Sequence, residues 1–93
     1  MLNLFSLLNK EKDLLYGKIM EQLKILSKKF ISENRVEATL SNNELMTVSM
    51  STNSEGKITF LILIGKKFYI DGDNLPTIYS DAYNYLSGQL LDN

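Results

Sequence analysis

Apolar residues in the first third of the chain recur at the spacing of an amphipathic helix. At about 100° per residue they fall on one stripe of a helix, and lysines fall roughly opposite. The stripe comprises Leu15, Ile19, Leu23, Leu26 and Phe30, and the lysines are Lys10, Lys18, Lys24, Lys28 and Lys29. Met1, Phe5 and Leu8 continue the stripe upstream. The pattern predicts either one helix over about residues 3–32 or a short first helix followed by a second that Asn9 caps.

The next segment alternates between apolar and polar residues, as strands with one buried face do. The alternation predicts four strands, over about residues 36–40, 44–52, 57–64 and 67–71. Hairpin turns are typically short and either polar or glycine-containing. Segments of this kind separate the predicted strands at residues 41–43, 53–56 and 65–66. The sequence therefore predicts a four-stranded antiparallel meander.

The lengths of these turns predict which residues face one another across the sheet. A two-residue turn at 65–66 sets Leu63 opposite Phe68, and a three-residue turn at 41–43 sets Ala38 opposite Met46. A four-residue turn at 53–56 sets Met46 opposite Leu63. These positions then share one face, and a slip of one residue would separate them.

The end of the chain predicts a further amphipathic helix. Pro76 suits the first position of a helix, and apolar residues then follow at i+4 spacing, namely Ile78, Ala82, Leu86 and Leu90. We expect this helix over about residues 76–91. The predicted fold is a single α+β domain over residues 1–93 with the order α-β-β-β-β-α. Residues 1–9 form either a separate short helix or a dimer arm in this prediction.

Both faces of the predicted sheet carry apolar residues, so the placement of the two helices decides which of them are exposed. If each helix covers one face, the domain is a closed three-layer sandwich. If both helices pack on the face of Met46 and Val48, then Phe60, Ile62 and Tyr69 form an exposed patch. We favour the second arrangement because polar residues are mixed into that face. Exposed patches of large apolar side chains typically mark a partner surface.

The length of the predicted first helix favours a dimer. A helix over residues 3–32 would span roughly 45 Å at 1.5 Å per residue, whereas a seven-residue strand covers only about 24 Å. The overhanging end would carry Met1, Leu4, Phe5 and Leu8. Exposing this apolar stripe to water is unfavourable, and a second copy of the chain is the commonest remedy.

The composition excludes several kinds of chemistry. The 93 residues include no Cys and no His, which excludes thiol nucleophiles, imidazole acid–base catalysis, disulfides and the usual zinc sites. A formal net charge of -1 argues against a general polyanion binder. No segment approaches the ~20 apolar residues of a membrane span, and the first residues lack the basic start of a secretion signal. A cytoplasmic protein without cofactors is therefore expected.

The acidic residues do not predict a metal or catalytic site. Asp71, Asp73 and Asn74 resemble the start of a calcium-binding loop. Counted from Asp71, however, the positions that need an oxygen ligand, a glycine and a glutamate hold other residues. A turn before a helix explains these residues better. We expect no metal ligands, no cofactor-binding residues and no catalytic residues, and therefore a protein that is not an enzyme.

The remaining hypothesis is a non-enzymatic protein-interaction module that acts as a homodimer. It would bind and regulate a protein of unknown identity as an inhibitor, adaptor or chaperone-like protein, and the small Asn-, Lys- and Ile-rich chain would suit a phage or plasmid accessory protein. Tyrosine is favoured at interfaces because it combines apolar area with a hydrogen-bonding tip. The candidate partner-binding residues are Phe5, Leu8, Phe60, Ile62, Tyr69 and Tyr85.

The alternative hypothesis is a small nucleic-acid-binding regulator. Residues 1–35 carry seven basic and four acidic groups, a net charge of +3, so the first helix could lie on phosphates. The candidate residues are Lys18, Lys24, Lys28 and Lys29. Readout of base edges prefers arginine, and Arg35 is the sole arginine of the chain. Retention on heparin that is lost between low and moderate salt would favour this alternative.

Overall fold

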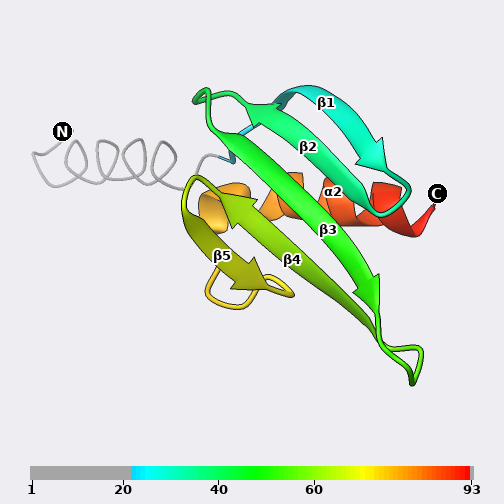
Figure 1. Cartoon of the computed structure of the whole chain (residues 1–93). Helices are drawn as coiled ribbons and strands as arrows, with labels where there is room; N and C mark the ends of the chain where they lie inside the picture. Colours follow the sequence, from blue (N-terminus) through cyan, green and yellow to red (C-terminus); the bar gives the residue numbers. More distant parts are fainter. Residues whose placement is uncertain (1–21, 93) are drawn as a thin grey trace, which may run out of the picture.

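The computed structural model describes residues 22–92, which form an antiparallel sheet and one helix (Figure 1). The five strands lie in the sheet in their order along the chain, so each strand pairs with the next. The elements are β1 (Ile25–Ser32), β2 (Arg35–Leu40), β3 (Leu45–Thr52), β4 (Ile58–Ile64), β5 (Lys67–Ile70), the short 3-10 helix η1 (Thr77–Tyr79) and the helix α2 (Ser80–Leu91). The strands β1 and β5 form the two edges of the sheet.

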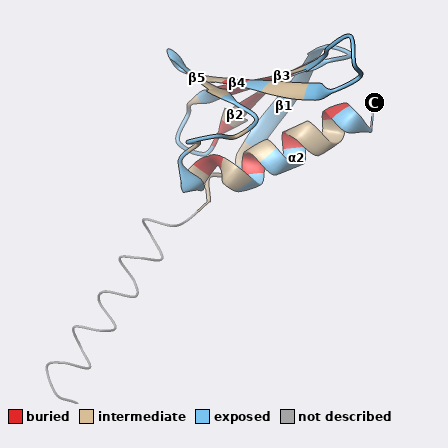
Figure 2. Cartoon of the chain, turned by 90° about the horizontal axis from the view of Figure 1, so that it is seen from below, coloured by how far each residue is buried: buried red, intermediate tan, exposed pale blue. Residues whose placement is uncertain are grey.

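The described residues form two layers, because α2 lies against one face of the sheet (Figure 2). The core between the layers comes from alternate residues of β2, β3 and β4 and from one stripe of α2. Its most buried side chains are Val36, Ala38, Leu40, Met46, Val48, Ile62, Ile64, Ala82, Leu86 and Leu90. The spacing of two residues in the strands and of four in the helix brings these side chains onto facing surfaces.

The antiparallel meander and the C-terminal helix are confirmed. Ala38 faces Met46 and Leu63 faces Phe68, as the turn lengths predict. The helical turn begins after Pro76, as η1, and continues into α2. The class is α+β with an antiparallel sheet.

The predicted register between β3 and β4 is wrong by one residue. Met46 faces Ile64, not Leu63. The backbone N–H of Asn53 donates to the carbonyl of Lys57 at 2.9 Å, so the hairpin closes over residues 54–56 and Asn53 belongs to the paired segment. The side-chain oxygen of Asn53 accepts the backbone N–H of Lys57 at 2.9 Å. A three-residue turn with a left-handed glycine is a common hairpin connection, and Gly56 has φ +83°.

The prediction of a helix over residues 3–32 is wrong for residues 25–32, which form β1. The sheet therefore has five strands, and the predicted four-stranded count is also wrong. Irregularities between residues 25 and 27 and between 30 and 32 interrupt the pairing of β1 with β2. Such bulges add a residue to one strand, so Ile25 and Lys28, three residues apart, both pair with residues of the covered face of β2. Residues 1–21, with the predicted arm at 1–9, lie outside the described residues.

Candidate functional site

The face of the sheet opposite α2 carries a group of apolar side chains that no described helix covers. Because Ile62 and Ile64 point toward α2, the alternate residues of β4 point to the other side. We call this side the open face, and its apolar residues are Leu45, Leu61, Leu63, Phe68 and Ile70. Four of them are between 40% and 64% exposed, and Leu63 is half-buried.

The pairing of the strands makes these residues one contiguous patch. Leu63 faces Phe68 and Leu61 faces Ile70 across β4 and β5. Leu45 lies on the neighbouring strand β3, and it joins Leu63 in lining a hollow of about 450 Å³ on this face. Directly opposite residues of antiparallel strands have Cβ atoms about 5 Å apart, so the side chains of the patch are in reach of one another.

The polar residues of the open face lie beside the apolar patch, on the neighbouring strand β3. Thr47, Ser49 and Ser51 alternate with the core residues of this strand. Farther along the sheet, Lys29 of β1 faces Glu37 of β2. An apolar centre with a polar margin is the usual composition of a protein interface.

The structure corrects the placement of three predicted partner-binding residues. Phe60, Ile62 and Tyr69 lie on the face that α2 covers, because the slip of one residue exchanges the two faces of β4. Ile62 is fully buried. The ring of Phe60 packs edge-on against Tyr83 of α2, with 6.1 Å between ring centroids. Phe60 and Tyr69 are partly buried against the core.

The other three predicted partner-binding residues do not lie near the open face or are not described. Phe5 and Leu8 lie outside the described residues. Tyr85 lies on α2 and is 48% exposed. It takes part in a second surface, between α2 and the edge strand β1.

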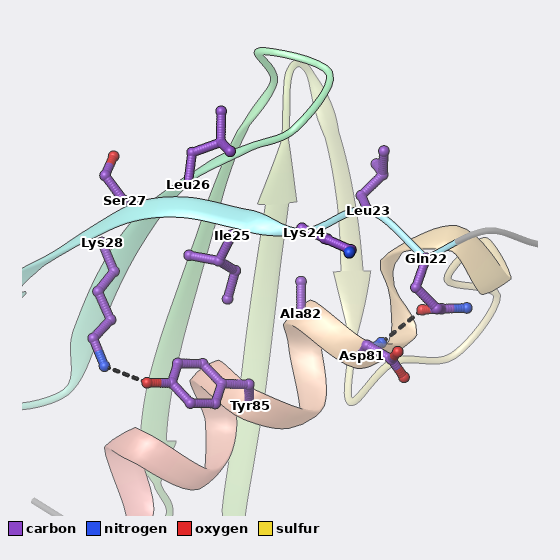
Figure 3. A pocket seen from close by; sticks show the side chains of 10 residues that line it. All are labelled: Gln22, Leu23, Lys24, Ile25, Leu26, Ser27, Lys28, Asp81, Ala82 and Tyr85. Carbon is purple, nitrogen blue, oxygen red and sulfur yellow. Dashed lines mark hydrogen bonds between the residues drawn. The ribbon is translucent and has the colours of Figure 1, made fainter.

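This second surface is a pocket of about 460 Å³ between β1 and α2 (Figure 3). Ile25 and Lys28 point from β1 toward α2, whereas Leu26 points to the other side. The Lys28 ammonium donates hydrogen bonds to the Tyr85 hydroxyl at 2.7 Å and to Oε1 of Gln89 at 2.6 Å. These bonds hold the middle of β1 against the helix.

The opposite end of the pocket is fixed by Gln22. Its side-chain nitrogen donates to the Thr77 carbonyl at 2.6 Å, and its side-chain oxygen accepts the backbone N–H of Asp81 at 2.8 Å. The first N–H groups of a helix lack partners within the helix, so Gln22 acts as a cap from outside α2. Asp81 lies at this end of the pocket and Lys28 at the other (Figure 3).

The lysines of the nucleic-acid alternative do not form one row within residues 22–92. Lys28 faces Ala38, on the covered side of β2, whereas Lys29 faces Glu37, on the open side. Lys24 precedes β1 and lines the pocket, and Lys18 lies outside the described residues. A helix would have aligned these lysines, but a strand sends neighbours to opposite faces.

Two tyrosines of the described residues have shifted pKa values. Burial, followed by the hydrogen bond and charge of Glu44, raises the pKa of Tyr79 to about 12. Burial, followed by the charges of Asp71 and Asp73, raises the pKa of Tyr83. In both cases the surroundings of the hydroxyl favour its protonated, uncharged form. Within residues 22–92, no group of three or more acidic side chains is placed to hold a metal ion.

The residues of the open face were missed because their exposure depends on a single turn. The local signal was present, since Asn53 and Gly56 enclose a turn with glycine at the position that needs positive φ. Interpreting 53–56 as four loop residues gave the wrong face to Leu61 and Leu63. No comparable sequence feature indicated that β1 is an edge strand, because its apolar residues have the spacing of a helix.

Comparison with known proteins finds no match among protein-family models, curated proteins or solved structures. In the part of the chain that the structure describes, neither helical element has the length and apolar character needed to cross a membrane.

Proposed function

We propose that this chain is a non-enzymatic protein-binding domain that works as a homodimer, with the open faces of two copies packed together. The observation that carries the proposal is the apolar patch of Leu45, Leu61, Leu63, Phe68 and Ile70 on a sheet face that α2 does not cover. Large exposed apolar patches mark interaction sites. The proposal includes a cytoplasmic role in which the dimer binds and regulates another protein as an inhibitor, adaptor or chaperone-like protein.

A second copy is the occupant that the chemistry of the open face favours. Two sheets pack face to face when each offers apolar side chains at alternate positions, which interdigitate as in a β-sandwich. The strand β4 contains no charged residue from Ile58 to Ile64, so two copies of this strand can approach without burying a charge. Glu37 of β2 faces Lys29 of β1, and it lies at the margin of the patch, where it lines the same hollow as Leu45 and Leu63.

Symmetry also supports self-association. A two-fold axis through the open face brings the same patch of both copies together, so one set of residues satisfies both sides of the interface. The net charge of the chain is -1, and such a small charge causes little repulsion between two copies. The dimer would leave the β1 edge and the pocket beside α2 accessible to a different protein.

Sedimentation equilibrium of the full chain and of one substitution tests this proposal. Phe68→Asp introduces a charge at a residue that is 64% exposed, so the variant should fold normally but sediment as a monomer. The matched control is Leu91→Asp, which changes an exposed apolar residue of α2 and should leave the dimer intact. The proposal fails if the unchanged chain is monomeric up to ~1 mM or if Phe68→Asp remains a dimer.

A further inference from the structure

The edge strand β1 has a regular order of apolar and basic residues. Its sequence from residue 25 reads Ile-Leu-Ser-Lys-Lys-Phe-Ile, so a pair of lysines stands between two pairs of apolar residues. Leu26 is 62% exposed and Ile31 is 48% exposed. Between its two irregularities, at residues 25–27 and 30–32, this edge strand offers backbone N–H and C=O groups to a further strand.

The two lysines decide what kind of strand can pair there. In an antiparallel pairing of β1 with β1 of a second copy that is centred on these residues, Lys28 would face Lys28 or Lys29 would face Lys29 at the two-fold axis, because residues directly opposite each other share a face of the sheet. Lysines directly opposite each other repel, and lysines on edge strands are a common device against self-pairing. A second copy is therefore disfavoured at this edge, whereas a strand with acidic residues at the same level is favoured.

The surroundings of Lys28 strengthen this argument. Its ammonium bonds to the Tyr85 hydroxyl and to the amide oxygen of Gln89, both of which are neutral groups. An ammonium has three N–H donors, so these two bonds leave one donor to spare, and the Tyr85 ring, whose centroid is 4.6 Å from Nζ, offsets only part of the charge. The two bonds also hold the ammonium in place beside the edge, which lowers the entropy cost of receiving a carboxylate.

The pocket between β1 and α2 supplies a place for an apolar side chain next to that carboxylate. It is lined by Ile25, Ala82 and the ring of Tyr85, with Lys28 at one end and Asp81 at the other (Figure 3). The repulsion of Asp81 keeps an acidic group at the Lys28 end. Its volume of about 460 Å³ lies in the range of ligand-binding clefts.

We propose that β1 binds an extended segment of another protein as a sixth strand, and that this segment carries two consecutive acidic residues between pairs of apolar residues. One carboxylate bonds Lys28 on the α2 side, and the other bonds Lys29 on the open side. The apolar pairs pack against Ile25 and Leu26 at one end and against Phe30 and Ile31 at the other. This inference rests on the proposed protein-binding function but uses a different surface from the proposed dimer.

A labelled synthetic peptide tests the inference on the full chain. The peptide Val-Val-Glu-Glu-Ser-Val-Val is complementary to β1 in antiparallel orientation, and the same peptide with Lys-Lys in place of Glu-Glu is its charge control. Fluorescence anisotropy should show saturable binding of the acidic peptide that weakens with salt. The backbone amide signals that shift on binding should be those of residues 25–32. No binding of the Lys-Lys peptide is expected.

A charge exchange gives the sharpest control. Lys28→Glu combined with Lys29→Glu should abolish binding of the acidic peptide and allow binding of the Lys-Lys peptide. If the double variant does not fold, Lys29→Glu alone replaces it as the test, because Lys29 lies on the open side and away from α2. This single variant should weaken binding of the acidic peptide severalfold. The matched control is Lys66→Glu with Lys67→Glu, which changes the same charge beside the opposite edge strand β5 and should bind like the unchanged chain.

The outcomes separate this inference from the proposed dimer. Failure of the acidic peptide to bind a chain that still dimerises overturns the inference alone. Binding that Phe68→Asp abolishes and the lysine exchange does not affect places the peptide on the open face and also overturns it. Equal binding of single-stranded DNA, lost with the same lysine exchange, overturns it in favour of a polyanion site.

Discussion

The hydroxyl of Tyr79 donates a 2.6 Å hydrogen bond to Oε1 of Glu44. Tyr79 ends η1 just before α2, and Glu44 lies in the turn between β2 and β3. The side chain of Asn42 also bonds this carboxylate oxygen. Tyr79 is only 9% exposed, and this partly buried bond joins the start of the helix layer to the sheet. It adds a polar contact between the two layers to the apolar core that holds α2 on this face of the sheet.

Removing the Tyr79 hydroxyl should lower stability without loss of the fold. Tyr79→Phe keeps the ring in the core but deletes the bond to Glu44, so we expect the free energy of unfolding to fall by about 1–2 kcal/mol. Urea denaturation followed by circular dichroism measures this change. Tyr85→Phe is the comparison: it also deletes a hydrogen bond, the exposed one from Lys28, and it should lower the free energy of unfolding by less than about 1 kcal/mol, because Tyr85 is 48% exposed. Equal costs for the two variants would contradict the structural role of Tyr79.

The raised pKa of Tyr79 predicts a loss of stability at high pH. Its pKa is about 12 in the folded chain against 10.0 for an unperturbed tyrosine. Above pH 10 the unfolded chain releases this proton while the folded chain retains it, so the unfolded state is increasingly favoured until the pH reaches about 12. Urea midpoints should be flat up to about pH 9.5 and fall above it. Tyr79→Phe should flatten this fall but not remove it, because burial also raises the pKa of Tyr83.

Substitutions at two neighbouring residues of β4 test the register directly. Ile62 is fully buried under α2, whereas Leu61 is 40% exposed on the open face. Ile62→Ala should lower the free energy of unfolding by about 2–5 kcal/mol, and Leu61→Ala should lower it by about 1 kcal/mol or less in dilute solution. If Leu61→Ala lowers the free energy of unfolding more than Ile62→Ala does, the register between β3 and β4 is wrong. For the same reason Phe60→Asp should unfold the domain, since Phe60 packs against Tyr83.

Two glycine turns separate the effect of backbone strain from that of packing. Gly65 and Gly72 both have positive φ, and a Cβ at Gly65 would meet nothing within 4 Å. A Cβ at Gly72 would lie 3.0 Å from Cε2 of Tyr83. Gly65→Ala should therefore cost about 1–2 kcal/mol from strain alone, and Gly72→Ala should cost more because the Tyr83 ring must also move. Equal costs in thermal denaturation would show that Tyr83 does not pack over this turn.

Local chemistry determined the parts of the fold that the sequence predicted. Gly65 and Lys66 form a two-residue turn whose geometry leaves one register, so the pairing of Leu63 with Phe68 followed from the sequence. Pro76 and the i+4 apolar series likewise predicted the final helix. At Asn53, one hydrogen bond to Lys57 decides between a three-residue and a four-residue turn. Counting turn residues does not reveal that bond.

The β1 strand shows a different limit of sequence reasoning. Leu23, Leu26 and Phe30 satisfy a helical period, yet residues 25–32 pair with β2. Pairing with β1 satisfies backbone groups of β2 that would otherwise be exposed, and this tertiary interaction overrides the helical pattern. In addition, Ile25, Phe30 and Ile31 are residue types that favour strands. The prediction of the open face depended on the length of the turn at Asn53. The prediction of the sheet edge depended on recognising β1 as a strand. The sequence pattern was misleading at both points, so neither the open face nor the β1 edge was predicted correctly.

The central claim, that two copies meet through their open faces, is tested most directly by isotope-filtered NMR on a mixture of labelled and unlabelled chains. Intermolecular NOEs should connect Phe68 and Ile70 of one copy with Leu61 and Leu63 of the other at about millimolar concentration. A spectrum in which these side chains show NOEs only within their own chain, whether to residues 1–21 or to solvent-exposed neighbours, would contradict the claim.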